Sequence, residues 1–231
     1  MPIIESIQVA SVAVPLDKVT SFSTRTVSER HYCLVKVRTK DGNEGIGFCY
    51  VGSAGGDIAK IAVEQLLAPK LIGQNSHRSE GLWMEMYNES ILQGRTGAVM
   101  RGISILDTAL WDLNARSVGL PLHQYLGSVV DDRVPAYASG GYYLEGKTPA
   151  KLGKEMESYV KQGFKAVKMK VGRLSPSEEE ARVKAARKAV GDDVLLTLDA
   201  NNAWRDLPTA LEYVRRFEAY NPYWIEEPFS P

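Results

Sequence analysis

Two lysines spaced two residues apart are the first residues in this sequence that could do chemistry. They stand in GFKAVKMKVG, residues 163–172, whose apolar residues predict a buried strand. Side chains alternate between the faces of an extended chain, so Lys168 and Lys170 lie on one face, about 7 Å apart, while Lys165 is out of register and reaches solvent. Because neighbouring ammonium groups disfavour each other's charge, and burial adds to this, we expect Lys170 to have a lowered pKa. It could then act as a general base near neutral pH.

Two later strands end in acidic residues. In LTLDANNAW, Asp199 and Asn201 share a face. In WIEEP, Glu226 lies on one face and Glu227 on the opposite, helix-facing side, which makes Glu227 the weaker candidate ligand. Two carboxylates and an amide oxygen are hard ligands that suit Mg²⁺, which keeps several waters and an open position for substrate. A divalent ion opposite a neutral amine is suited to removing a proton next to a carboxylate.

Two other interpretations fit the same charges. Burying one unpaired charge costs several kcal/mol, so lysines and carboxylates could gather only to neutralise each other in a structural ion-pair network. The repetition of charge at the ends of three consecutive strands favours a functional site over that network. A lysine in a barrel can also form a Schiff base with a carbonyl substrate, but this chemistry leaves Asp199 and Glu226 without a shared role.

The first part of the chain predicts strands followed by helices. HYCLVKVRTKDGNEGIGFCY contains two β-rich runs that join through Asp41-Gly42, a strong hairpin signal. The polar segment 18–30, rich in Ser and Thr, predicts a mobile loop. Hydrophobic periodicity then predicts helices over 57–71, 76–92 and about 97–118. We therefore expect an α+β domain over residues 1–127.

From VPAYASGGYY onward, strands alternate with helices. Thr148 with Pro149 predicts one helix start, and a capping box at Ser175 and Glu178 predicts another. The spacing is 29 residues from Lys170 to Asp199 and 27 from Asp199 to Glu226, which is typical of parallel βαβ units. No Gly-rich phosphate-binding fingerprint follows these strands, so residues 128–231 predict the first half of a (β/α)8 barrel rather than a nucleotide-binding sheet.

Composition excludes several classes of partner. The 231 residues contain 28 Lys plus Arg and 28 Asp plus Glu, so no net field draws in nucleic acid or an anionic membrane. No signal peptide or long apolar run is present, and we expect a cytoplasmic protein that binds a small molecule. The two cysteines and three histidines have no metal-ligand spacing, and we assign them no chemistry.

Three of these motifs carry a resemblance to a known family. KAVKMKVG, LTLDANNAW and WIEEP, in that order and spacing, resemble the enolase superfamily, in its mandelate racemase and muconate-lactonizing branch. GISILDTALWDLNARSVGLPLHQYLG is similar to the last helix of the family's N-terminal capping domain and the segment that leads into its barrel. The resemblance covers nearly the whole chain and implies an α+β capping domain followed by a (β/α)8 barrel.

The resemblance also implies a role for each site residue. Lys170 matches the base that abstracts or returns the α-proton of a carboxylate substrate, and Lys168 matches the partner that tunes it and helps to hold the substrate. Asp199 and Glu226 match the first two carboxylates that bind Mg²⁺, and Asn201 matches a residue beside the metal and substrate. The shared step is formation of an enediolate, after which members act as racemases, acid-sugar dehydratases or cycloisomerases. We also expect a homo-oligomer in the full-length form.

Two segments match the positions of the family's substrate-specifying loops. They are the polar segment 18–30, with Arg25, and the turn YVGSAGG, with Tyr50. Their hydroxyl groups and Arg25 suit a hydroxylated acid, which favours acid-sugar dehydration or racemisation of a hydroxy acid.

The sequence departs from the family pattern at its end. It stops at EEPFSP, after about half of the eight strands that a barrel needs. The family's third metal carboxylate and its second acid/base group would lie beyond Pro231. Our interpretation is that the chain is a fragment of a longer enzyme, and we expect residues 1–231 alone to be catalytically inactive.

Overall fold

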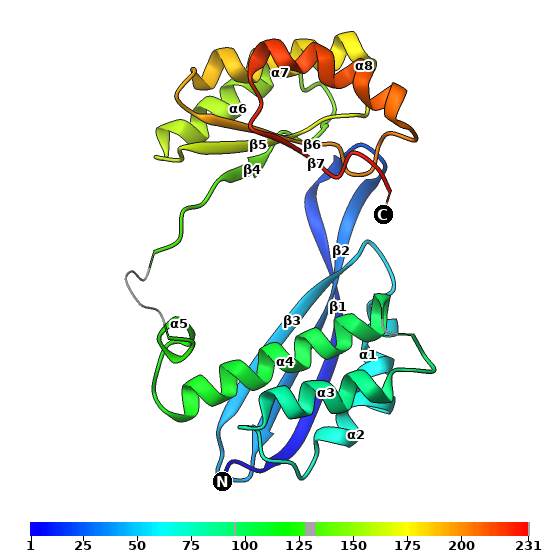
Figure 1. Ribbon diagram of the computed structural model, residues 1–231, viewed down its shortest axis with the longest axis vertical. Coiled ribbons are helices and arrows are strands. Elements are labelled where there is room, and N and C mark those ends of the chain that lie inside the picture. Colours follow the sequence, from blue (N-terminus) through cyan, green and yellow to red (C-terminus); the bar gives the residue numbers. More distant parts are fainter. Residues whose placement is uncertain (95, 128–132, 231) are drawn as a thin grey trace. The chain divides into compact units, whose positions relative to one another are not determined.

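The computed structural model describes residues 1–94, 96–127 and 133–230, which form two compact units. One unit contains Met1–Leu16 with Ser28–Asp132, and the other contains Asp17–Val27 with Arg133–Pro231. Figure 1 shows the order of the elements along the chain. The division expected after residue 127 stays a prediction. Residues 17–27 do not follow it, because they cluster with the second unit although they precede residue 127.

The first unit is built on a three-stranded sheet in the order β1-β2-β3. The strands are β1 (Ile4–Ser21), β2 (Thr26–Thr39) and β3 (Glu44–Gly52). The predicted hairpin is confirmed: β2 and β3 pair antiparallel, and the turn between them contains Gly42 at a φ of 89°. A glycine adopts this left-handed backbone without strain.

The helices of the first unit follow the sheet. They are α1 (Gly56–Ile61), a π-helical segment (Ala62–Leu67), α2 (Ala68–Leu71), α3 (Ser79–Glu89), α4 (Gly97–Ser117) and α5 (Leu122–Tyr125). The helix predicted over 57–71 is confirmed as an unbroken helical run from Gly56 to Leu71, whose middle part, Ala62–Leu67, is π-helical. Pro69 in its last turn has no backbone N–H to donate to the preceding turn.

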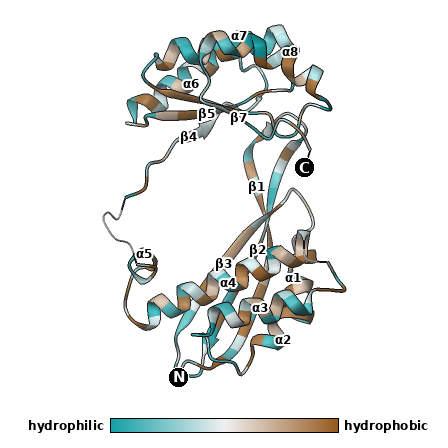
Figure 2. Cartoon of the chain, in the orientation of Figure 1, coloured by the Kyte–Doolittle hydropathy of each residue, from teal (hydrophilic) through white to brown (hydrophobic). Residues whose placement is uncertain are grey.

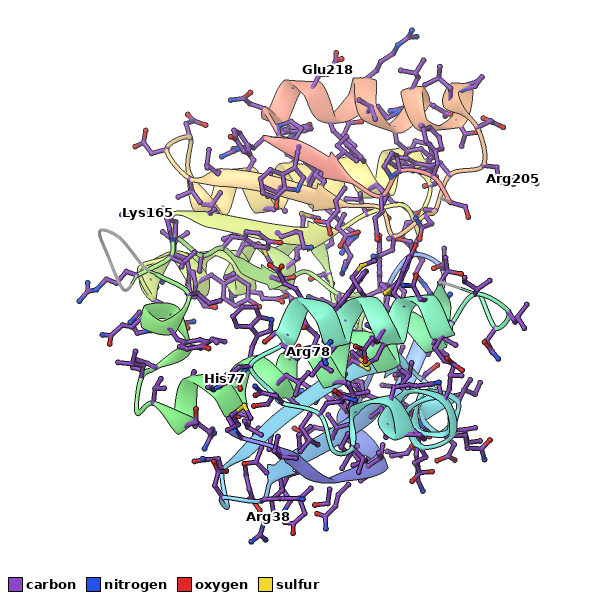
Figure 3. The ribbon with its side chains drawn as sticks, turned by 60° about the horizontal axis from the view of Figure 1, so that its bottom comes forward. Arg38, His77, Arg78, Lys165, Arg205 and Glu218 are labelled. Carbon is purple, nitrogen blue, oxygen red and sulfur yellow. The ribbon has the colours of Figure 1, made fainter. Side chains whose placement is uncertain are left out.

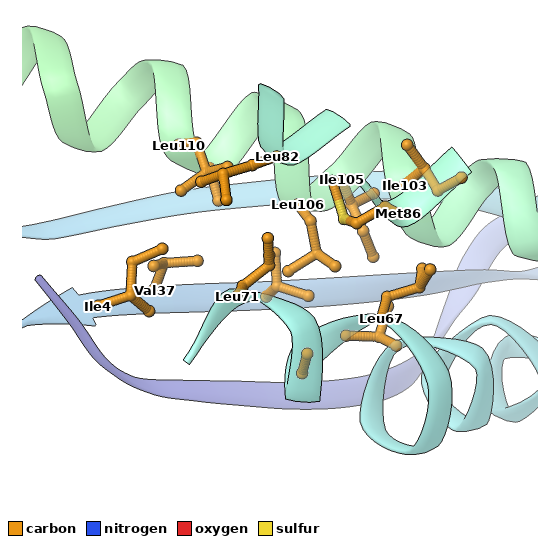
Figure 4. Packing of buried hydrophobic residues seen from close by; sticks show 14 of the residues in the cluster. Ile4, Val37, Leu67, Leu71, Leu82, Met86, Ile103, Ile105, Leu106 and Leu110 are labelled. Carbon is orange, nitrogen blue, oxygen red and sulfur yellow. The ribbon is translucent and has the colours of Figure 1, made fainter. Parts of the chain in front are cut away.

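Helix α4 forms the core of the first unit with the sheet. The helix predicted over about 97–118 is confirmed, and Ile103, Leu106 and Leu110 on its apolar face are fully buried (Figure 4). Along α4, hydrophobic and hydrophilic segments alternate, as in an amphipathic helix (Figure 2). Gly45 and Gly47 of β3 let the helix approach closely, because a Cβ at either position would overlap the backbone of α4.

The expectation of a loop over 18–30 is wrong. Strand β1 continues to Ser21 and β2 begins at Thr26, so only residues 22–25 form the turn, which the backbone N–H of Phe22 closes by donating to the carbonyl of Arg25. Thr and Val recur through this segment, and β-branched residues fit an extended strand well. The polar composition of this segment reflects a largely solvent-exposed two-stranded ribbon rather than a loop.

The second unit is a parallel sheet in the order β4-β5-β6-β7 with helices between the strands. Its strands are β4 (Ala138–Gly140), β5 (Ala166–Lys170), β6 (Leu195–Asp199) and β7 (Trp224–Glu226). Its helices are α6 (Pro149–Lys161), α7 (Pro176–Val190) and α8 (Leu207–Phe217), followed by a 3-10 turn (Glu218–Tyr220). This alternation confirms the predicted repeat.

The local signals for these helices are also confirmed. The Thr148 side chain accepts the backbone N–H of Lys151 at the start of α6, and Ser175 and Glu178 form the capping box of α7. One face of β5 and β6 is fully buried against the helices and consists of Val167, Met169, Val171, Leu196, Leu198 and Ala200. The opposite face therefore carries the charged side chains.

No helix within the described ranges is long and apolar enough to cross a membrane.

Candidate active site at the strand ends

The parallel register places the charged residues of three strands side by side. Lys170 pairs with Asp199 across β5 and β6, and Asp199 pairs with Glu226 across β6 and β7. All three lie at the C-terminal ends of their strands, the end at which (β/α)8 barrels build active sites. Lys168, two residues earlier, shares the face of Lys170, as predicted.

Direct contacts join these four charged groups. The Nζ of Lys170 lies 2.6 Å from Oδ2 of Asp199. The Nζ of Lys168 lies 2.8 Å from Oε2 of Glu226 and 3.3 Å from Oδ2 of Asp199. Lys168 and Lys170 are 8% and 7% exposed and Asp199 is 1% exposed. The lysine–aspartate contacts are therefore shielded from water, which strengthens the attraction between the charges.

The protonation of Lys168 follows its carboxylate partners. Burial alone would lower the pKa of Lys168, but hydrogen bonds to Glu226 and Asp199 and the charges of both carboxylates outweigh it and raise that pKa above the ordinary value. At Lys168 these partners therefore outweigh the effect of the neighbouring ammonium group, whereas the expectation made for Lys170 stays a prediction. The carboxylates lie closer to its charge than that argument allowed, so Lys168 is held as a cation.

Asn201 and Glu227 leave the strand alternation that the sequence suggested. Both have left-handed backbones, with φ of 46° and 47°, so strand alternation does not set the direction of either side chain. The Asn201 amide donates from Nδ2 to Oε2 of Glu227 at 3.1 Å, and its backbone N–H donates to Oδ1 of Asp199 at 3.0 Å. Glu227 is thus an exposed partner of Asn201, and its lesser weight as a candidate ligand stays a prediction.

The donor set at the strand ends fits a hard divalent cation. An ammonium cation, that of Lys168, already bridges Asp199 and Glu226, which shows that a positive ion can contact both carboxylates at once. The Oδ1 of Asn201 is buried and has no hydrogen-bond partner within the part of the chain that the structure describes. Two protein carboxylates suit Mg²⁺, which retains several waters. Within the described residues, His, Cys, Asp and Glu form no group of three that could hold a metal.

The remaining predicted site residues have different surroundings. Lys165 is exposed and Figure 3 shows it at the margin of its unit, as expected. Arg25 lies in the turn between β1 and β2 with an exposed side chain, which makes no hydrogen bond or ion pair to the charged cluster among the described residues. Tyr50 belongs to the first unit, where its ring lies 5.8 Å from that of Tyr32.

Family models match both parts of this chain. The model described as Mandelate racemase / muconate lactonizing enzyme, N-terminal domain, matches residues 4–127, and the model described as Enolase C-terminal domain-like matches residues 151–231. The chain belongs to the mandelate racemase and muconate lactonizing enzyme family. Its fold is accordingly an α+β capping domain followed by the first part of a (β/α)8 barrel.

Characterised members of the mandelate racemase and muconate lactonizing enzyme family resemble the chain along most of its length. An arabinonate dehydratase of Saccharolobus solfataricus is 38% identical over 195 residues, which cover 84% of this chain and 52% of the relative. An L-talarate/galactarate dehydratase of Salmonella typhimurium is 33% identical over 216 residues, which cover 92% and 52%. The chain thus spans about half the length of these relatives.

A solved family structure has the same fold over nearly the whole chain. A racemase from Streptomyces coelicolor A3(2) with bound magnesium superposes with a TM-score of 0.91 at 31% identity, which covers 99% of this chain and 63% of the racemase.

The aromatic neighbours of the two lysines were missed in the sequence. The Nζ of Lys168 lies 5.4 Å from the ring centroid of Tyr137, and the Nζ of Lys170 lies 5.4 Å from that of Tyr142 and 5.9 Å from that of Phe22. Tyr142 follows the C-terminal end of β4, a position that could have indicated a site residue. Phe22 carried no such signal, because only the folded chain brings the β1–β2 turn to β5.

Proposed function

We propose that this chain forms part of a Mg²⁺-dependent enzyme that removes the α-proton of a small carboxylate through an enediolate intermediate. The observation that carries the proposal is the contact network of Lys168, Lys170, Asp199 and Glu226 at the ends of three consecutive parallel strands. The family membership supports it, and so do the dehydratases and the racemase to which the chain is similar.

Each residue of the network has a part in the proposed reaction. Lys170 removes the α-proton of the substrate at its Nζ or returns a proton there. Lys168, which its partners hold as a cation, helps to bind the substrate carboxylate. Asp199 and Glu226 would hold Mg²⁺, which when bound stabilises the negative charge that develops on the substrate carboxylate. Asn201 donates its backbone N–H to Asp199, and its Oδ1, which has no hydrogen-bond partner among the described residues, is the group that we propose to stand beside the metal and substrate.

The substrate class that we propose is a hydroxy acid or an acid sugar. The arabinonate and L-talarate/galactarate dehydratases support it, because both are named for polyhydroxylated acids. In dehydration, loss of the α-proton is followed by departure of the β-hydroxyl group as water, and the resulting enol becomes a 2-keto acid. In racemisation, the proton returns to the opposite face instead.

Cycloisomerisation is the second candidate. The chain is 32% identical over 229 residues to a 3,6-anhydro-alpha-L-galactonate cycloisomerase of Streptomyces coelicolor. A substrate panel of aldonates, aldarates and sugar acid lactones separates the candidates, because a dehydratase forms a 2-keto acid and a racemase forms an epimer. A cycloisomerase forms an isomer that has neither change.

The proposal is tested by α-proton exchange in D₂O with a full-length protein that carries this chain. We expect Mg²⁺-dependent exchange that EDTA abolishes, and we expect Lys170→Ala to slow exchange from one face by about 10³-fold or more, the scale of lost acid–base catalysis. Lys165→Ala, on the same segment but exposed, is the matched control and should leave exchange unchanged. Activity that survives EDTA, with borohydride trapping of substrate on Lys170, would instead support a Schiff base.

A further inference from the structure

A buried ion pair on α7 contacts the C-terminal end of β5, the strand that carries Lys170. Glu179 and Arg182 stand three residues apart on α7, with 2.7 Å between Oε2 and Nη1. Glu179 is fully buried and Arg182 is 5% exposed. A pair of charges in such a place costs more in lost hydration than its own attraction returns, unless further hydrogen bonds satisfy both groups. The partners of these two residues therefore show what the pair holds.

Glu179 holds the turn that follows β5. Its Oε1 accepts the backbone N–H groups of Gly172, Arg173 and Leu174, each at 3.0 Å. It also accepts the hydroxyl of Tyr143. One carboxylate oxygen thus fixes three consecutive peptide groups directly after the strand.

Arg182 holds the main chain of Lys170 itself. Its Nη1 donates to the carbonyl of Lys170 at 2.8 Å, and its Nη2 donates to the carbonyl of Gly141 at 2.7 Å. The guanidinium group lies 3.9 Å from the ring centroid of Tyr143, a stacking distance. The ends of β4 and β5 are thereby tied to α7 by a planar, doubly donating group.

The same cluster reaches the turn between β1 and β2. Tyr143 pairs with Ser21 through two backbone hydrogen bonds, of 2.9 and 3.1 Å. Arg173 donates from Nη1 to the carbonyl of Phe22 at 3.0 Å, and the Phe22 ring lies near the Lys170 ammonium. A continuous chain of contacts therefore runs from Ser21 through Tyr143, Glu179 and Arg182 to the carbonyl of Lys170.

We propose that Glu179, Arg182 and Tyr143 are positioning residues for the Lys170 amine. Among the described residues, they contact the carbonyl of Lys170 and the peptide groups that follow it, and not its Nζ, so they act by fixing where the strand end presents the side chain. A reacting group displaced by about 1 Å can lose about 100-fold in rate. The inference rests on the proposed function only in naming Lys170 as the base, because the positioning itself can be measured without turnover.

The first test measures the reactivity of Lys170 in the 231-residue chain. Trace acetic anhydride labels amines, and peptide mass mapping gives the rate for Lys170 relative to exposed Lys161. In Glu179→Gln and Tyr143→Phe we expect this relative rate to rise about tenfold, the scale of one lost charge-assisted hydrogen bond. Glu180→Gln is the matched control: Glu180 is the next residue of α7, but it pairs with Arg216 at 3.1 Å, and its loss should change nothing.

A double variant separates positioning from stability. Glu179→Gln leaves the Arg182 charge buried and unpaired, so it should lower the melting temperature. Glu179→Gln combined with Arg182→Met removes both charges and should recover most of the melting temperature, yet Lys170 should remain as reactive as in the single variant. If Lys170 keeps its wild-type relative rate in Tyr143→Phe and in the folded double variant, the cluster is only structural and the proposal is overturned. If Glu179→Gln does not fold, the labelling of Lys170 in Tyr143→Phe and in the double variant still tests the proposal.

The second test uses α-proton exchange by a full-length protein that carries the chain. Tyr143→Phe and the double variant should each lower kcat, by up to about 100-fold, while KM stays within about twofold. Substrate binding is untouched in these variants and only the base is misplaced. A rise in KM with an unchanged kcat would contradict the positioning role. If the wild-type protein exchanges no α-proton with any acid, the proposed function fails, whereas the labelling rates still decide the positioning role.

Discussion

At the scale of single residues, the two lysines of β5 show how partners decide chemistry. Alternation places Lys168 and Lys170 on one face, but it does not say which carboxylate each one meets. Lys168 reaches across β6 to Glu226, whereas Lys170 contacts Asp199 on the adjacent strand. Lys168 and Lys170 thus have different carboxylate partners although they stand two residues apart.

Tyr143 gives a residue-scale prediction about alkaline stability. Burial, with the neighbouring charge of Glu179, raises the pKa of Tyr143 above the ordinary 10, and the charge of Arg182 only partly opposes this. The unfolded chain ionises this tyrosine near pH 10 and the folded chain does not. The stabilisation that the neutral hydroxyl gives is therefore complete below pH 10 and is lost as pH rises above it.

Urea unfolding at pH 9, 10 and 11 tests the prediction. Above pH 10 we expect the free energy of unfolding to fall more steeply in the wild type than in Tyr143→Phe, by about 1 kcal/mol per pH unit. Both proteins share the other tyrosines, so the difference between the two curves reports Tyr143 alone. Parallel curves for the two proteins would show that Tyr143 does not ionise differently in the folded and unfolded chains.

At the scale of elements, close approach between β3 and α4 depends on glycine. A Cβ at Gly47 would overlap the backbone carbonyl of Ile105 on α4, which cannot move aside as a side chain can. We expect Gly47→Ala to lower the free energy of unfolding by about 1–3 kcal/mol, the cost of overpacking a core.

Gly81→Ala is the control for this prediction. Gly81 lies in α3, where a Cβ would meet only the Arg78 side chain at 3.6 Å, an ordinary contact. The substitution should raise the free energy of unfolding by about 0.5–1 kcal/mol, because alanine loses less backbone freedom than glycine in a helix. Chemical denaturation of both variants provides the measurement, and a Gly47→Ala protein as stable as the wild type would refute the packing argument.

At the scale of the whole molecule, each unit has its own core, but the chain spans 52% of two of its relatives. The charged cluster presents two carboxylates from neighbouring strands, fewer acidic groups than the family resemblance implies for its metal site. We expect residues 1–231 alone to exchange no α-proton, even with Mg²⁺ and an acid sugar present.

The purified chain is the sample for this measurement. Exchange in D₂O is followed by NMR, with circular dichroism to establish that the sample is folded. A full-length protein that carries the chain is the positive control. Exchange by the chain alone, lost in Lys170→Ala, would show that the residues described here suffice for proton removal.

Local patterns in the sequence determined the strand and helix order, the hairpin at Gly42, the caps of α6 and α7, and the face shared by Lys168 and Lys170. These features depend on neighbours within a few residues, where alternation and capping chemistry apply. Alternation failed at Asn201 and Glu227, because both leave their strands with left-handed backbones that no local pattern required.

Only the tertiary structure decided which side chains meet across strands. The parallel register set Lys170, Asp199 and Glu226 side by side, and the β1–β2 turn brought Phe22 to Lys170 although nearly 150 residues separate them. The buried Glu179–Arg182 pair carries no signal in the local sequence pattern, which predicts only the helix that contains it. Its role depends on backbone groups of β4 and β5, and such contacts arise from packing rather than from sequence spacing.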